Sequence, residues 1–126
     1  MSVVGIGNDL LEIARIVNMP PRACEKLSMR ILTKSELQIY AQHNYPQRFL
    51  AKRWAAKEAA AKALGTGIAN GVSFQHIEIS NLDNGQPRLS FSGRALEIAE
   101  QLNARSFHIS LSDEEHYAMA FVVLSE

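Results

Sequence analysis

Apolar and polar positions follow different patterns in the two halves of the chain, with helical spacing in the first half and frequent alternation in the second. The clearest helical segment is an alanine-rich stretch of strong helix formers between Pro46 and Gly65. Proline suits the first turn of a helix, and glycine suits the left-handed residue that ends one. The pattern therefore predicts one long helix between these two residues.

A first strand and a shorter helix are predicted before this long helix. The run from Val3 to Gly7 is rich in residues that favour strands and contains two glycines, which indicate a bulge or the close approach of another group. Thr33 and Glu36 form the capping-box signature that opens a helix. We expect this helix to continue to about Gln42.

The second half is predicted to consist mainly of strands joined by hairpins. Asn84 and Gly85 mark a tight turn, and the acidic residues 113–115 link two further strands. Because helices gather in the first half and strands in the second, we expect an α+β fold with an antiparallel sheet. The predicted elements are a strand over 72–79, a strand over 88–91, a helix over 94–102, and hairpin strands over 107–111 and 116–124.

Composition narrows the class of protein. A length of 126 residues with 47% hydrophobic side chains is typical of a single compact domain, here residues 1–126. The longest apolar run, Tyr117 to Leu124, has eight residues, whereas a membrane-spanning helix needs about 20. The lone Cys24 cannot form an intramolecular disulfide, and the N-terminus lacks the basic segment of a signal peptide. We therefore expect a cytoplasmic protein.

Charge is distributed unevenly although the net charge is zero. Residues 1–64 contain ten Lys and Arg against five Asp and Glu, whereas residues 65–126 contain three against eight. A basic half can attract nucleic acid, a phosphorylated ligand or an acidic protein, or it can simply attract the acidic half of the same chain. Four cations form one basic face near the N-terminus: Arg15, Arg22, Lys26 and Arg30.

Two acidic residues are candidates for chemistry. Asp9 comes at the end of the glycine-marked strand, where a dinucleotide-binding motif fails because Leu10 stands in place of its third glycine. Taken alone, Asp9 is more typical of a turn or a cap, although a ligand for a hard cation is often placed this way. Glu58 lies one helical turn before Lys62, and this spacing alone indicates an ordinary salt bridge.

The surrounding charge favours a second interpretation. One glutamate cannot neutralise the other cations of the same segment, which are Arg48, Lys52, Arg53 and Lys57. An anionic ligand would account for the excess, and the carboxylates of Asp9 and Glu58 would suit Mg²⁺ shared with phosphate oxygens. Cys24 has no assigned base, and we interpret the histidines at 43, 76, 108 and 116 as structural, since they lack metal-ligand spacing. The attacking group is therefore expected to belong to a substrate.

Four blocks of the sequence, taken together and in order, resemble the holo-[acyl-carrier-protein] synthases, which are small bacterial phosphopantetheinyl transferases. The resemblance covers nearly the whole chain, and the second block is the most specific. The blocks are residues 5–15 (Gly-Ile-Gly-Asn-Asp-Leu-Leu-Glu-Ile-Ala-Arg), residues 48–67 (Arg-Phe-Leu-Ala-Lys-Arg-Trp-Ala-Ala-Lys-Glu-Ala-Ala-Ala-Lys-Ala-Leu-Gly-Thr-Gly), residues 84–87 (Asn-Gly-Gln-Pro), and residues 108–113 (His-Ile-Ser-Leu-Ser-Asp) followed by Tyr117 and Ala118.

The resemblance implies an enzyme that moves 4′-phosphopantetheine from coenzyme A to a serine of apo-acyl carrier protein, in support of fatty acid biosynthesis. Adenosine 3′,5′-bisphosphate would be released. The resemblance makes Asp9 and Glu58 the ligands of Mg²⁺ and places Lys62 at the pyrophosphate, so these three form the expected catalytic set. The residues expected to bind the cofactor are Arg53, Lys62, Gly85, Gln86, Pro87 and Ser112.

The resemblance also implies partners and reveals departures from the family pattern. Asp113 stands where many members have histidine, and an ionised carboxylate cannot donate to a phosphate, so that contact is expected to be lost or replaced. Asn8 and Trp54 replace the commonest threonine and phenylalanine.

The resemblance implies a homotrimer with coenzyme A between subunits, without nucleic acid or membrane partners. The basic face defined above would dock the acidic carrier. The alternatives are a transferase for secondary-metabolism carriers and a non-catalytic nucleotide- or RNA-binding module.

Overall fold

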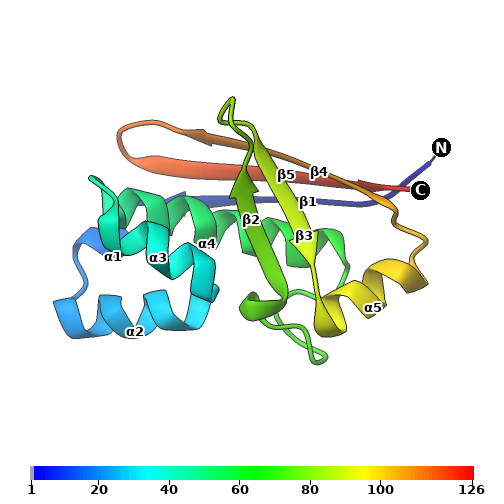
Figure 1. The fold of residues 1–126 in the computed structure, drawn as a ribbon, viewed down its shortest axis with the longest axis horizontal. Helices are drawn as coiled ribbons and strands as arrows, with labels where there is room; N and C mark the ends of the chain where they lie inside the picture. Colours follow the sequence, from blue (N-terminus) through cyan, green and yellow to red (C-terminus); the bar gives the residue numbers. More distant parts are fainter. Residues whose placement is uncertain (1) are drawn as a thin grey trace.

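The computed structural model describes residues 2–126 and shows a long helix packed along a three-stranded antiparallel sheet (Figure 1). The sheet has the order β1-β5-β4, so the N-terminal strand lies beside the C-terminal strand. The bounds of these elements are β1 (Val3–Glu12), α4 (Pro46–Ala63), β4 (Ser106–Asp113) and β5 (Tyr117–Ser125). The α+β fold with an antiparallel sheet and a long alanine-rich helix is thus confirmed.

Helix α4 approaches β1 so closely that side chains are excluded from part of the contact. A Cβ atom on Gly7 would lie 2.1 Å from the carbonyl oxygen of Ala59, and one on Gly5 would lie 2.1 Å from that of Ala63. Any larger residue at these two positions would push the helix away from the strand. The two glycines of the first strand therefore serve the close approach that the sequence predicted.

The helices of the first half begin and end at the predicted signals. Thr33 and Glu36 form a complete capping box at the start of α3, while Pro46 opens α4. Gly65, just beyond α4, has a φ of 81°, a left-handed conformation that glycine adopts without strain. In Figure 1 these helices gather at one end of the molecule: α1 (Ala14–Val17), α2 (Pro21–Ile31) and α3 (Lys34–Gln42).

A separate two-stranded hairpin crosses α4 and leads to the last helix (Figure 1). The predicted strand over 72–79 is wrong at its start, because the backbone N–H of Ser73 donates to Nδ1 of His76 and closes a turn there. The first strand also continues past Gly7 to Glu12, since β5 offers it hydrogen-bonding partners along that length. The elements are η1 (Phe74–His76), β2 (Ile77–Asn81), β3 (Pro87–Phe91) and α5 (Gly93–Gln101).

A buried ion pair lies between α4 and α3. Lys57 is fully buried, and its Nζ donates to a carboxylate oxygen of Glu36 and to the backbone carbonyl of Ile31 at 2.6 Å. Burial lowers the pKa of Lys57, while the adjacent Glu36 charge opposes that shift. Among residues 2–126, none of the helices has both the length and the apolar character needed to cross a bilayer.

Candidate functional site

Two carboxylates come together where α4 meets β1. Asp9 lies within β1, opposite Ala120 of β5, so neither the turn nor the strand end expected from the sequence is correct. Glu58 comes from the middle of α4. Burial raises the pKa of Glu58, and the negative charge of Asp9 raises it further, while Lys62 partly opposes both effects. The contact between strand and helix therefore concentrates negative charge at one place.

Lys62 already neutralises part of that charge. Its Nζ donates to Oδ1 of Asp9 and to the backbone carbonyl of Asn8, each at 3.0 Å. The salt bridge between Lys62 and Glu58 that spacing alone indicates does not form, since no ion pair within residues 2–126 joins those two side chains. The side chain of Lys62 is 51% exposed, so it can leave Asp9 for a ligand at low cost. We call Asp9, Glu58 and Lys62 the carboxylate site.

The carboxylate oxygens of this site fit Mg²⁺ better than a structural zinc ion. The part of the chain that the structure describes holds no cluster of three or more His, Cys, Asp or Glu side chains. A tetrahedral zinc site would need such a cluster. Mg²⁺ commonly takes one or two carboxylates and completes its shell with water and substrate phosphates. Asp9 and Glu58 match that requirement.

Arg53 lies elsewhere, with only 3% of its surface exposed. Its Nη2 donates to Oδ1 of Asn81 at 3.0 Å, and its guanidinium lies 4.6 Å from the ring centroid of Phe49. Nε is 3.8 Å from Oε2 of Glu36 and, although buried, has no hydrogen-bond partner among the described residues. Burial lowers the pKa of Arg53, and the Glu36 charge works against that shift. Arg53 and Asn81 both line a cavity of about 280 Å³.

The predicted turn at residues 84–87 joins β2 to β3 and is tied to Arg53. Gly85 has a φ of 89°, which explains the need for glycine there. The side chain of Asn84 accepts a hydrogen bond from the backbone N–H of Gln86 at 3.0 Å. Nδ2 of Asn81 donates to the carbonyl of Gly85 at 2.9 Å. We call Arg53, Asn81 and this turn the arginine–turn site.

The structure brings Arg53 close to the turn but not to the carboxylate site. Arg53 and Lys62 are nine residues apart on α4, about two and a half turns, so they lie on opposite sides of the helix. Asn81, which connects Arg53 to the turn, carried no signal in the sequence, because an asparagine at the end of a strand is common near turns. One helix thus carries two sites on two faces.

Ser112 also lies away from the carboxylate site. It pairs across the sheet with Met119, which in turn pairs with Leu10, so these three share one face. Successive residues of a strand point to opposite faces, and Asp9 therefore faces α4 instead. Ser112, Leu10 and Met119 line a shallow cavity of about 330 Å³ on the outer face of the sheet.

Asp113 stands where many members of the family that the sequence resembles carry histidine. In this chain it forms ion pairs with residues of α4. Its Oδ2 accepts a hydrogen bond from Nη1 of Arg48 at 2.9 Å, and its Oδ1 is 3.6 Å from Nζ of Lys52. Burial tends to raise the pKa of Asp113, but these two cations lower it below its usual value. Arg48 also donates to the carbonyls of Glu114 and Glu115, which fixes the β4–β5 hairpin against α4.

The predicted basic face is exposed, and three of its four residues lie on α2. Arg15 lies over the ring of Trp54, 4.9 Å from its centroid, and Arg30 lies 5.5 Å from that of Phe74.

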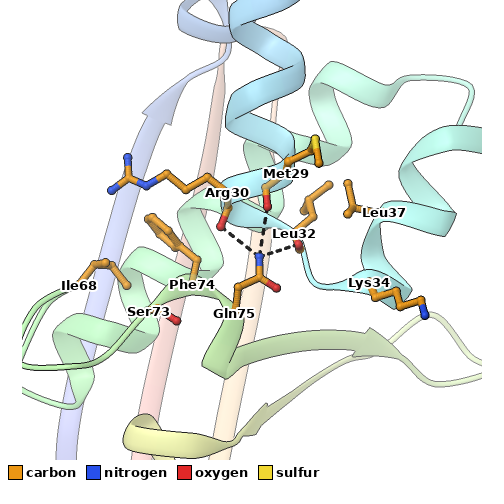
Figure 2. Close-up of a pocket in the computed structure, with 9 residues that line it drawn as sticks. All are labelled: Met29, Arg30, Leu32, Lys34, Leu37, Ile68, Ser73, Phe74 and Gln75. Atoms are coloured by element: carbon orange, nitrogen blue, oxygen red, sulfur yellow. Dashed lines mark hydrogen bonds between the residues drawn. The ribbon is translucent and has the colours of Figure 1, made fainter.

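Figure 2 shows how the end of α2 is held, beside a cavity of about 560 Å³. The side-chain amide of Gln75 donates to three backbone carbonyls there, those of Met29, Arg30 and Leu32 (Figure 2).

The histidines and Cys24 make local contacts. His43 Nδ1 accepts from the backbone N–H of Tyr45, His76 closes the turn described above, and His108 lies 3.2 Å from the hydroxyl of Ser125. Cys24 is buried, with its sulfur 3.7 Å from the hydroxyl of Tyr40. These contacts agree with the structural roles that we expected for His43, His76 and His108.

Comparison with known proteins identifies the relatives of the chain. Residues 5–122 match the family model of the 4′-phosphopantetheinyl transferase superfamily. Holo-[acyl-carrier-protein] synthase from Shewanella denitrificans is 58% identical over 125 residues, 98% of each chain. The structure of holo-[acyl-carrier-protein] synthase from Neisseria meningitidis has a TM-score of 0.90 at 40% identity, covering 99% of this chain and 100% of that one. The Helicobacter pylori enzyme, in complex with coenzyme A, has a TM-score of 0.81 at 33% identity, covering 95% of this chain and 99% of that one.

These matches include both the strand and the helix that carry the carboxylate site, and they agree with the fold over almost the entire chain. Because the family model matches residues 5–122 and a relative is 58% identical over 98% of each chain, this chain belongs to the 4′-phosphopantetheinyl transferase superfamily.

Proposed function

We propose that the chain is a holo-[acyl-carrier-protein] synthase. It transfers 4′-phosphopantetheine from coenzyme A to a serine of apo-acyl carrier protein, releases adenosine 3′,5′-bisphosphate, and so supports fatty acid biosynthesis. The observation that carries this proposal is the carboxylate site, where Asp9 and Glu58 meet beside Lys62. The name of the Shewanella denitrificans relative and the coenzyme A complex of the Helicobacter pylori relative support it.

The residues of the carboxylate site suit phosphoryl transfer. Asp9 and Glu58 would hold Mg²⁺, which neutralises phosphate charge when bound. Lys62 exchanges its contact with Asp9 for one with the pyrophosphate, where its ammonium stabilises the developing negative charge. The serine hydroxyl of the carrier would give up its proton to water and form the new bond to the β-phosphorus, while the bond to the adenosine bisphosphate breaks and that leaving group keeps the electron pair. The chain offers position and charge, and the substrate supplies the nucleophile.

The arginine–turn site is proposed to hold the adenosine end of coenzyme A. Arg53 lines a cavity of about 280 Å³, and its guanidinium suits the 3′-phosphate. The turn formed by Gly85, Gln86 and Pro87 offers backbone groups for adenine. Ser112 lies on the outer face of the sheet, so its hydroxyl would reach the same ligand from another copy of the chain. These assignments follow the family pattern and depend on an assembly that brings the two sites together.

A homotrimer is proposed as that assembly. The carboxylate and arginine–turn sites lie on opposite sides of α4, so one bound coenzyme A molecule would reach both only if neighbouring subunits each supply one. The outer face of the sheet exposes the apolar residues Ile6, Leu10, Met119 and Phe121. Contact between copies through this face would bury them. Light scattering would test the assembly, and Met119→Glu should produce monomers without transfer activity.

The basic face is proposed to dock the carrier protein. Arg22, Lys26 and Arg30 recur along one exposed face of α2, and complementary charge speeds encounter and fixes orientation.

We also propose that residues 1–126 act as one domain. The expected cytoplasmic location stays a prediction, to be tested by cell fractionation.

One experiment tests the proposed function directly. The purified protein is incubated with coenzyme A, Mg²⁺ and apo-acyl carrier protein, and the carrier is analysed by mass spectrometry. We expect the carrier to gain the mass of one phosphopantetheine, and the gain to disappear with EDTA. A mass gain only on a peptide-synthetase or polyketide carrier would favour the secondary-metabolism alternative, and no gain on any carrier would contradict the proposal.

A further inference from the structure

We infer that Asn81 is a positioning residue that fixes the Arg53 guanidinium relative to the turn at residues 84–87. The inference rests on the proposed function, because the proposed function places Arg53 at the 3′-phosphate and the turn at the adenine of the same adenosine moiety. Asn81 touches neither reacting atom. It would act through the two groups that it joins, and so determine how well the enzyme recognises the 3′-phosphate of coenzyme A.

The hydrogen bonds of Asn81 are divided between the two groups. Oδ1 accepts from Arg53 at 3.0 Å, and Nδ2 donates to Gly85 at 2.9 Å. A side-chain amide is planar, so one rotamer sets both bonds at once. The amide therefore links the buried helix α4 to the exposed turn, and movement of one end is transmitted to the other.

No other close hydrogen bond orients the guanidinium of Arg53 among the described residues. Phe49 supports its face, and Glu36 lies 3.8 Å from Nε, beyond hydrogen-bond distance. Glu36 is already occupied, since Oε1 accepts from the backbone of Thr33 and from Lys57 while Oε2 accepts from the backbone N–H of Ile79. Rotation of the guanidinium is thus controlled at Asn81.

The turn depends on Asn81 in a different way. Its internal bonds, such as that from the backbone N–H of Gly85 to the carbonyl of Leu82 at 2.8 Å, shape the turn but do not connect it to α4. Pro87, which pairs with Asn81 across the hairpin, has no N–H to donate. The side chain of Asn81 supplies a connection that the backbone at this pair cannot.

Two substitutions separate the two bonds of Asn81. Asn81→Ala removes both, whereas Asn81→Asp keeps the acceptor for Arg53 and loses the donor to Gly85. Ser80→Ala, at the exposed neighbouring position on the same strand, is the matched control, and Arg53→Gln is the reference for loss of the cation. Steady-state kinetics of all variants are measured with coenzyme A and with dephospho-coenzyme A, which lacks the 3′-phosphate.

We expect Asn81→Ala to raise the KM for coenzyme A about tenfold, as befits one hydrogen bond to a charged group, with kcat within about twofold. The KM for dephospho-coenzyme A should change much less, so discrimination between the two substrates falls toward that of Arg53→Gln. Asn81→Asp should raise both KM values, and more for coenzyme A, because its carboxylate also repels the 3′-phosphate. Ser80→Ala should match the wild type.

Two outcomes would overturn the inference, and they differ in meaning. If Arg53→Gln removes discrimination but Asn81→Ala retains it, the 3′-phosphate assignment stands and Asn81 has no positioning role. If Arg53→Gln also retains discrimination, the phosphate is not bound by Arg53, and the inference fails together with that part of the proposed function. Circular dichroism checks folding, and Asn81→Ser replaces the alanine variant if that variant does not fold.

Discussion

The two sites on α4 differ in how firmly their groups are held. At the carboxylate site, Lys62 is half exposed and makes its contacts to Asp9 and a backbone carbonyl at the surface. At the arginine–turn site, Arg53 is buried, donates to Asn81 and packs against the ring of Phe49. The exchange proposed for the carboxylate site, of a lysine contact for a metal and a phosphate, needs groups that can move. A site that recognises a fixed part of its ligand gains from groups that are already placed.

Both sites exist because of the alanines and glycines around α4. Small residues let the helix lie directly on β1, which brings Glu58 to Asp9, and the opposite side of the helix is left for Arg53 and Lys57. Glu36 pairs with Lys57 and lies 3.8 Å from Arg53, so its carboxylate faces both cations there. The carboxylate site thus arises where α4 packs directly on β1, whereas the arginine–turn site adjoins a buried network of charged side chains.

The largest effect should follow loss of either carboxylate. Asp9→Ala and Glu58→Ala should each lower kcat/KM by at least about 1,000-fold, because each removes one of the two protein ligands proposed for Mg²⁺. Thermal unfolding should change little. The control Glu100→Ala removes an exposed carboxylate of α5 and should leave turnover intact. A folded Glu58→Ala enzyme with a near-normal rate would contradict the metal assignment.

Lys62→Ala should produce a smaller loss, about 100-fold in kcat, if its charge acts mainly on the developing oxyanion. Binding of coenzyme A with Mg²⁺, measured by calorimetry, should persist. Single-turnover assays separate this loss from slow product release. Equal losses in binding and kcat would instead place Lys62 with the groups that hold the ground state, as at the arginine–turn site.

Arg22→Glu tests a region outside both sites and should raise the KM for the carrier about tenfold, with coenzyme A affinity near that of the wild type. Added salt should imitate the substitution, since exposed charges are screened over about 8 Å at physiological ionic strength. The two proteins should converge as salt rises, and Arg105→Glu serves as a charge-matched control. Flat, parallel salt curves would eliminate carrier docking by the basic face.

The smallest effect is expected for Asp113→Asn, about 1 kcal/mol or less of unfolding free energy at pH 7. The folded pKa of Asp113 is lowered, so its ion pairs stabilise the fold above the unfolded pKa of about 3.9, and that contribution disappears as the pH falls through the lower folded value. Denaturant unfolding from pH 7 to 3 should therefore show the variant and the wild type converging in acid. A difference that stays the same size from pH 7 to pH 3 would mean that the substitution acts through packing.

Features that depend on neighbouring residues were predicted correctly from the sequence. The start of α3 at Thr33 and the end of α4 before Gly65 rest on hydrogen bonds and backbone angles within a few residues. The resemblance, through specific blocks, led to the family that the comparisons confirm, and it singled out Asp9, Glu58 and Lys62, which the structure places at one contact.

What the sequence by itself determined was therefore the fold class, the signals that open α3 and bound α4, and the family, while the site residues that it singled out stay predictions; each is marked by local propensity or by a specific motif. Only the tertiary structure decided that Lys62 binds Asp9 instead of Glu58, that β1 reaches Glu12, and that Asn81 joins Arg53 to its turn. Each of these is a choice among partners distant in the chain. Spacing along one helix or strand cannot specify such a choice, since the competing partner enters only when the elements pack.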